Sequence, residues 1–376
     1  MLSFSSIVGL AVTGSVAFVI WKAYPKPIAG VPYHKKSARS ILGDIPRLSQ
    51  SLKKTQDFVK YIVDEAEVFQ GPIFQLFLSP FSSPTIVIVD YEETRDIMLH
   101  RTGEFDRSKR VQEVFRPIIG TNQFVLDSGE TWKLHRRLVQ DTMSPAFLRD
   151  VAAPSLYKAF QVLVDLWDRK IALASGRPFP VGEDISAATL DGVLAFTFGS
   201  NLSNTATMPR LEALTSLDPK SWVESLHQDA PVDFPTNRTH PSIEAVGGIS
   251  HYLAKVSEYP VPNMAWWFFK RTSHFQQQSK LKKEFIHSKI EKSIHATAGK
   301  ADGTTVLRNA VDLVIDRERR LSERYGKTPD YFSDAVVDEL FGFTLAGHET
   351  TSTTMAWVMK ILTSHPSIQL KLRRLL

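Results

Sequence analysis

The sequence contains no cysteine among its 376 residues. This absence excludes disulfide bridges, a thiolate metal site and a cysteine nucleophile. His348-Glu349 matches the start of a zinc-protease motif, but that motif needs a second histidine four residues after the first, and position 352 is Ser352. The remaining histidines show no ligand spacing. The residues therefore predict no metal site made by protein side chains alone.

Proline is absent from the span 331–365, and apolar residues recur there at helical spacing. We expect one long, largely buried helix. Near its middle lies the small pair Ala346-Gly347, followed by Glu349 and by Thr350, whose hydroxyl can bond to the carbonyl of Ala346 one turn earlier. A gap without a side chain, an acid and a hydroxyl are thus gathered at one place. This arrangement suits a flat ligand against the helix and a proton relay beside it.

A second helical stretch carries an aromatic residue and a basic residue on one face. Trp132 and Arg136 are four positions apart, so their side chains are neighbours on the helix surface. An indole donor and a guanidinium fork together suit a carboxylate. An aromatic residue packed under a solvated basic helix is the alternative interpretation of the pair.

Charge is absent from Leu2–Trp21, which is rich in Val, Ile, Leu, Phe and Ala. A bilayer core of about 30 Å needs about 20 such residues in a helix. Basic residues follow this stretch and none precedes it, so the main body is expected in the cytosol. Ser15-Val-Ala17 fits a signal-peptide cleavage site, but the apolar run continues past it, which favours an uncleaved, single-pass anchor.

Three parts are expected along the chain: a transmembrane anchor at 1–21, a basic, proline-rich linker at 22–45 and one domain at 46–376. The domain is expected to be mostly α with a small β-sheet. We predict strands at 72–78 and 85–90, helices at 91–99, 153–173 and 185–198, a loop at 228–248, a solvated basic helix face at 270–295 and a charged linker at 316–327. The basic residues are not interleaved with base-stacking aromatics, so no nucleic acid is expected as a partner.

The segment Ala346-Gly-His-Glu-Thr-Thr351 resembles the central-helix pattern Ala/Gly-Gly-x-Asp/Glu-Thr-Thr/Ser of the cytochrome P-450 family, the heme-thiolate monooxygenases. Trp132-x-x-x-Arg136 resembles the pair with which that family holds a heme propionate. Met143-Ser-Pro-Ala-Phe147 follows in the family's order. The resemblance covers nearly the whole chain and points to a microsomal, fungal-like member.

The resemblance implies the amino-terminal and central part of the P-450 fold, with heme as cofactor. Trp132 and Arg136 would bind a propionate, Ala346 and Gly347 would face the heme, and the catalytic residues Glu349 and Thr350 would relay protons. Electrons would come ultimately from NADPH through a membrane-bound reductase, and a small apolar substrate would be hydroxylated. The expected location is the endoplasmic reticulum membrane.

The sequence also departs from the family pattern. After the stretch 367–376, which looks like the next helix, the family has a Glu-x-x-Arg helix and a loop with the iron-ligating cysteine, and neither is present. We therefore expect a carboxy-terminally truncated domain that is inactive as it stands. Any heme would be held loosely, or through a histidine such as His135 or His348. The alternative is a non-catalytic, membrane-anchored remnant that binds a lipid or a partner.

Overall fold

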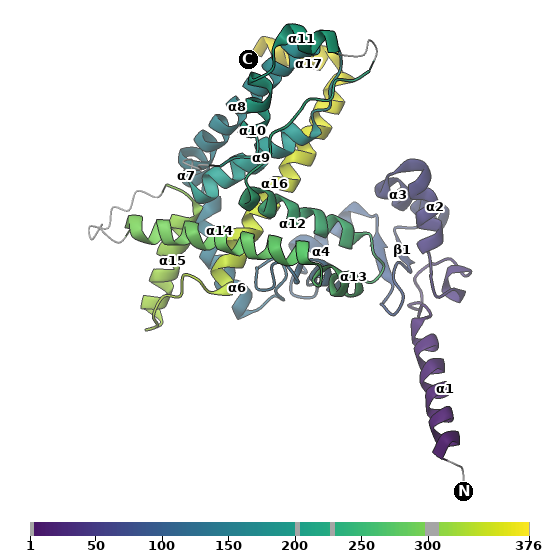
Figure 1. The fold of residues 1–376 in the computed structure, drawn as a ribbon. Helices are drawn as coiled ribbons and strands as arrows, with labels where there is room; N and C mark the ends of the chain where they lie inside the picture. Colours follow the sequence, from purple (N-terminus) through teal and green to yellow (C-terminus); the bar gives the residue numbers. More distant parts are fainter. Residues whose placement is uncertain (1–3, 200–203, 226–229, 298–307, 376) are drawn as a thin grey trace. The chain divides into compact units, whose positions relative to one another are not determined.

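The computed structural model describes residues 4–199, 204–225, 230–297 and 308–375, with side chains described from residue 13 onward except at 223–225 and 297. Within these ranges the chain is mostly α-helical and has one two-stranded antiparallel sheet (Figure 1). The predicted fold class, mostly α with a small sheet, is confirmed. The chain divides into two units, Met1–Asp106 with Ser257–Ala265, and Arg107–Val256 with Trp266–Leu376.

The sheet lies in the first unit. β1 (Ile73–Leu76) pairs with β2 (Thr85–Ile88), so that Ile73 is opposite Ile88 and Leu76 is opposite Thr85. Phe74 and Leu76 on β1 are fully buried and pack with Tyr61. The helices around the sheet in sequence are α1 (Phe4–Ala23), α2 (Ile45–Thr55), α3 (Phe58–Phe69) and α4 (Tyr91–Leu99), and α4 begins and ends as predicted.

The predicted linker lies against this sheet. The side chain of Gln75, on β1, is fully buried. Its amide nitrogen donates to the carbonyls of Ile28 and Val31, at 2.8 and 2.7 Å, and its amide oxygen accepts from the Ile28 backbone at 2.9 Å. A buried amide with these partners holds the proline-rich segment in place.

The predicted anchor falls partly outside the described residues, because residues 1–3 have no described structure and side chains up to residue 12 are not described. A helix does form there, α1, with Lys22 in its last turn. Among the residues that the structure does describe, no helix has the length and apolar character needed to cross a membrane. The described side chains of α1 start at Thr13, about halfway along the roughly 20 residues that a bilayer requires. The transmembrane part of the prediction is therefore not confirmed.

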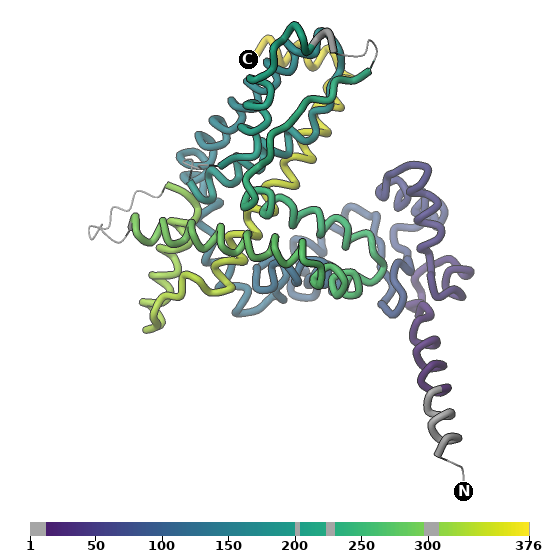
Figure 2. The backbone as a smooth tube through the Cα atoms, viewed as in Figure 1, coloured from purple at the N-terminus to yellow at the C-terminus, as the bar shows by residue number. Residues whose placement is uncertain are grey.

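The remaining helices carry the candidate site. Along the chain they are α5 (Lys109–Phe115), α6 (Glu130–Val139), α7 (Pro145–Phe147), α8 (Ala153–Ala174), α9 (Gly182–Phe198), α10 (Met208–Thr215), α11 (Pro219–Ser225), α12 (Pro241–Ser257), α13 (Pro262–Phe269), α14 (Ser273–Thr297), α15 (Ala310–Arg324), α16 (Asp334–Thr363) and α17 (Pro366–Leu375), with short 3-10 and π turns between α6 and α8. Helix α9 packs against both α8 and α16, as the tube in Figure 2 shows. Leu190, Val193 and Leu194 on α9 are buried there.

Two predicted loops are in fact helices. α12 begins at Pro241, inside the predicted loop 228–248, of which 228 and 229 lie outside the described residues. Proline at the first position of a helix loses no hydrogen bond, and Ile243, Val246 and Ile249 then bury one face. α15 covers most of the predicted linker 316–327, because its charges pair along the helix and its apolar residues face inward.

The prediction for 270–295 was also incomplete. α14 is basic, but it is not only a solvated face, because Ile286 and Ile290 are fully buried and Lys282 is 9% exposed.

Candidate functional site

Helix α16 carries the predicted central motif. Ser333 caps it by accepting a hydrogen bond from the backbone of Val336, and the helix continues without interruption to Thr363. Its buried residues lie between Val336 and His348, and from Glu349 onward the side chains are exposed or half-buried. The prediction of one long helix is confirmed, but burial covers only its first half.

Two glycines let other elements approach α16 closely. A Cβ atom at Gly342 would lie 2.3 Å from Nδ2 of Asn122, and a Cβ atom at Gly347 would lie 3.0 Å from Cγ2 of Val193 on α9. The open side of Gly347 therefore receives α9. Helix packing is thus one role of Gly347, and its predicted place beside a heme stays a prediction.

A buried carboxylate joins α16 to the segment before α6. Glu339 is 1% exposed. Its Oε1 accepts from the Gln123 backbone at 2.6 Å, and its Oε2 accepts from Nδ2 of Asn122 at 3.0 Å and from Nε2 of Gln123 at 3.2 Å. Nδ1 of His135, on α6, lies 2.9 Å from Oε1. Because these partners come from α6 and from the turn before it, Glu339 fixes α6 against α16.

Helix α6 presents the predicted aromatic and basic pair. The indole Nε1 of Trp132 is buried and has no hydrogen-bond partner among the described residues. The guanidinium of Arg107 lies 5.5 Å from the centre of the Trp132 ring, within cation–π range. Arg136 is exposed and makes one long hydrogen bond, 3.4 Å, to Oε1 of Gln123. The unpaired indole donor of Trp132, with Arg107 and Arg136 nearby, is suited to bind an anion.

The predicted relay residues lie on the exposed half of α16. Oγ1 of Thr350 donates to the carbonyl of Ala346 at 2.6 Å, which confirms the back-bond expected from the sequence. Oγ1 of Thr354 donates in the same way to Thr350 at 2.8 Å. Glu349, whose side chain is 52% exposed, lies 3.7 Å from Nδ1 of His348. The hydroxyls of Thr350 and Thr354 and the carboxylate of Glu349 therefore lie on a solvent-facing stretch of α16.

Helical geometry relates this stretch to α6. Successive residues are rotated by about 100°, so positions 339, 346 and 350 lie on one stripe of α16. Glu339, Ala346 and Thr350 thus share a face, and Glu339 is the residue that binds His135 of α6. No described contact joins Trp132 or Arg136 directly to Ala346, Gly347, Glu349 or Thr350. The structure brings the two helices together at Glu339 and leaves Ala346 and Thr350 exposed.

Both histidines named as possible iron ligands have hydrogen-bond partners within the protein. His135 is held by Glu339, and Nε2 of His348 lies 3.0 Å from Oγ of Ser186 on α9. His348 is 5% exposed, and this burial lowers the pKa of its imidazole. Both rings have protein partners in this structure, and a histidine-held heme stays a prediction.

Sequence reasoning missed Glu339 and its contact with His135. A single glutamate inside a helix and a histidine between basic residues carry no pattern that pairs them. The available signal was energetic, because a charged side chain at an apolar helix position is costly without buried partners.

The described residues fit one cofactor group. The unpaired Nε1 of Trp132, with Arg107 over its ring and Arg136 one turn further along α6, provides donors and positive charge for a carboxylate. The side chains of Ala346 and Thr350 on α16 are exposed and small. Donors for a carboxylate on one helix, beside a helix with small exposed residues, are features that a heme-binding helical protein requires.

The chain belongs to the cytochrome P450 family, whose family model matches residues 38–374. It is 33% identical over 367 residues to "Cytochrome P450 monooxygenase TRI13" of Fusarium sporotrichioides, a match that covers 96% of this chain and 62% of the relative. It is 30% identical over 380 residues to "Cytochrome P450 monooxygenase GME11363" of Pestalotiopsis microspora, with 98% and 63% covered. A more distant relative, "Steroid 17-alpha-hydroxylase/17,20 lyase" of Rattus norvegicus, is 24% identical over 373 residues, with 96% and 63% covered. The chain spans somewhat less than two thirds of the length of these relatives.

Proposed function

We propose that these 376 residues form the propionate-side and distal-side part of a heme-dependent monooxygenase that hydroxylates a small apolar molecule. The observation that carries the proposal is the buried, unpaired indole N–H of Trp132 beside two guanidinium groups. A heme propionate would accept from this donor and would be held by the charge of Arg136.

Heme, when bound, supplies dioxygen activation at its iron. Within the proposal, Ala346 leaves space above the ring, because its side chain is a single methyl group. Glu349 holds a proton at the solvent-facing side of α16. Thr350 holds the next position, and its hydroxyl, already bonded to the carbonyl of Ala346, can pass a proton towards the ring face. Electrons would come from NADPH through a reductase, as the family implies.

The absence of cysteine gives this proposal a sharp test. A polypeptide of these 376 residues has no sulfur atom that could ligate iron through a thiolate. Expressed alone and reduced under carbon monoxide, it is expected to give no thiolate-type band and no turnover with a reductase. A chimera in which the family's cysteine-bearing segment follows Leu376 is expected to gain the band. A thiolate-type band from the 376 residues alone would contradict the proposal.

The propionate contact is tested in the same chimera. Trp132→Phe removes the indole donor and keeps an aromatic ring, so heme retention on a desalting column should fall about 10-fold, the value of one hydrogen bond to a charged group. Trp267→Phe, at an indole that is 62% exposed, is the matched control and should retain heme normally. Equal retention in both variants would remove Trp132 from the site.

We also propose that the amino-terminal segment attaches the chain to the endoplasmic reticulum membrane with its body in the cytosol. The uncharged stretch Leu2–Trp21 followed only by basic residues supports this proposal. Alkaline extraction of microsomes should leave the chain in the pellet, in a form digested by protease added outside. A shortened chain protected in the lumen would show instead that the segment is a cleaved signal peptide.

A further inference from the structure

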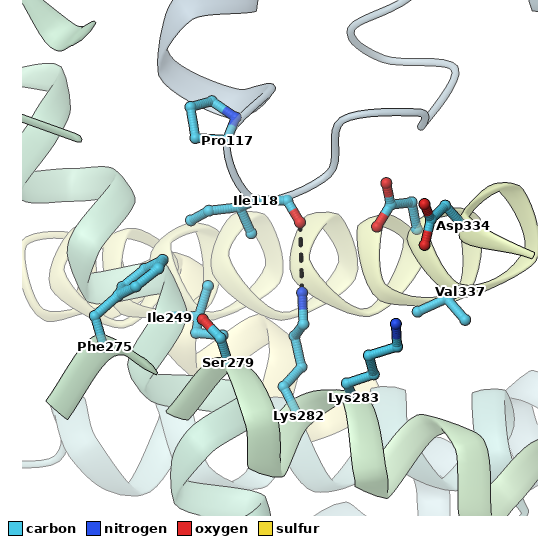
Figure 3. Close-up of a pocket in the computed structure, with 10 residues that line it drawn as sticks. Pro117, Ile118, Ile249, Phe275, Ser279, Lys282, Lys283, Asp334 and Val337 are labelled. Carbon is cyan, nitrogen blue, oxygen red and sulfur yellow. Dashed lines mark hydrogen bonds between the residues drawn. The ribbon is translucent and has the colours of Figure 1, made fainter. Parts of the chain in front are cut away.

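A cavity of about 210 Å³ lies between α12, α14, α16 and the turn after α5 (Figure 3). Ile118, Ile249 and Phe275 form an apolar wall. Figure 3 shows the side chains of Lys282 and Lys283 extending from α14 into the cavity, with Lys282 bonded to the carbonyl of Ile118. The cavity therefore combines apolar surface with two ammonium groups.

Lys282 is a buried cation with few polar partners. It is 9% exposed, and its Nζ makes one long hydrogen bond, 3.4 Å, to the carbonyl of Ile118. It also lies 4.1 Å from the centre of the Phe341 ring. Among the described residues no carboxylate lies within ion-pair distance of Nζ. An ammonium can donate three hydrogen bonds, so donors remain unused beside the cavity.

Burial and the charged groups near Lys282 together set its pKa. Burial lowers the pKa of Lys282 to about 8, the nearby charge of Asp338 opposes this shift, and Lys283 adds to it. Asp338 is already engaged, since its Oδ2 accepts from both the backbone and the hydroxyl of Thr121 at 2.9 Å. Asp334 is the first residue of α16, where the helix dipole favours a negative charge. Asp338 is thus engaged by Thr121, and Lys282 has no carboxylate partner among the described residues.

This cavity is separate from the proposed heme face. At about 100° per residue, Asp334 and Val337 lie about 120° or more around α16 from Ala346 and Thr350, and Asp338 lies about 80° from Ala346. Along the helix, Asp338 and Thr350 are about 18 Å apart. A molecule in the cavity would therefore contact α16 without reaching the relay residues.

We propose that this cavity is a binding site for a small carboxylic acid with an apolar body. The carboxylate accepts hydrogen bonds from Lys282 and is attracted by Lys283. The apolar body lies against Ile118, Ile249 and Phe275. This site does not depend on the heme function, because its residues on α16 are not those proposed to face the heme.

The test uses isothermal titration calorimetry of the full chain in mild detergent, with hexanoate as the probe and 1-hexanol as its neutral counterpart. Hexanoate should bind and 1-hexanol should bind at least about 10-fold more weakly, since it lacks the charged acceptor. Lys282→Met should weaken hexanoate binding about 10-fold or more. Lys280→Met, at a lysine on α14 that is 77% exposed, should leave binding unchanged.

Two further readouts keep the test decisive. Hexanoate affinity should be constant between about pH 6 and 8, where the probe is a carboxylate, and fall above pH 8, because Lys282 must be protonated to bind it. If the methionine variant does not fold, acetylation of the natural chain followed by peptide mass spectrometry replaces it, and hexanoate should protect Lys282 more than 1-hexanol does. Equal binding of acid and alcohol, no loss in the Lys282 variant, or no selective protection would each overturn the proposal.

Discussion

The buried carboxylate of Glu339 allows a graded prediction about the contact between α6 and α16. Glu339→Gln keeps the shape of the side chain and replaces one acceptor oxygen with a donor. The least costly arrangement puts the new amide nitrogen at Oε2, because the Gln123 amide can rotate to accept from it and Asn122 keeps its bond to the carbonyl of Asp338 at 3.0 Å. The remaining losses are the bond from Asn122 to Oε2, the long bond from Arg136 to Gln123, and the charge that strengthened the bonds to the Gln123 backbone and to His135.

These losses set the expected magnitudes. Weakening charged hydrogen bonds at one buried site costs about 1–3 kcal/mol of unfolding free energy. Glu339→Ala removes the acceptors entirely and leaves buried donors on Asn122, Gln123 and His135, which costs about 3–5 kcal/mol. Against a total stability of about 5–15 kcal/mol, the alanine variant should lose a large fraction of its unfolding free energy.

Urea unfolding followed by circular dichroism in mild detergent measures both variants. Glu244→Gln is the matched control, because Glu244 is an exposed helical glutamate with no described side-chain partner, and it should change stability by less than about 0.5 kcal/mol. The reasoning is refuted if the alanine variant loses no more than this control, since Glu339 would then not hold α6 against α16.

Three further outcomes are expected. Between pH 8 and 10.5 the free energy of unfolding should rise by about 3 kcal/mol, because Lys282, with its pKa lowered to about 8, loses its proton in the folded state before it does so in the unfolded state. Urea midpoints at pH 7 and pH 10 should show most of this rise, and Lys282→Met should lack it. Gly342→Ala should lower the melting temperature, since its Cβ would displace Asn122, whereas Gly182→Ala, with open space around it, should not. In the cysteine-bearing chimera, Thr350→Ala should increase oxygen consumption relative to product formed, and unchanged coupling would argue against the relay.

The parts of the site that sequence could predict are those with a local signature. The back-bond of Thr350 follows from a hydroxyl four residues after a carbonyl, and α16 follows from a proline-free stretch of apolar residues at helical spacing. Trp132 and Arg136 lie together on α6 because four residues make about one turn.

What sequence could not predict depends on contacts between distant segments. Glu339 binds residues more than 200 positions away, and nothing local identifies them. Lys282 is one of many basic residues on α14, and only the packing of α16 and the Ile118 turn against it makes it buried. Likewise nothing local to Gly347 shows that Val193 of α9 packs against it.

The change in burial along α16 has a consequence for its motion. Amide hydrogens from Val336 to Leu345 are shielded by α9 and by the turn around Asn122, so they should exchange with solvent only when the whole unit opens. Beyond Thr351 the same helical hydrogen bonds face water and should exchange through local fraying. Glu349 and Thr350 lie at the boundary between these two regimes. The residues proposed to move protons are thus fixed at one end by a slowly exchanging half-helix, while the half that follows them can bend on a much shorter timescale.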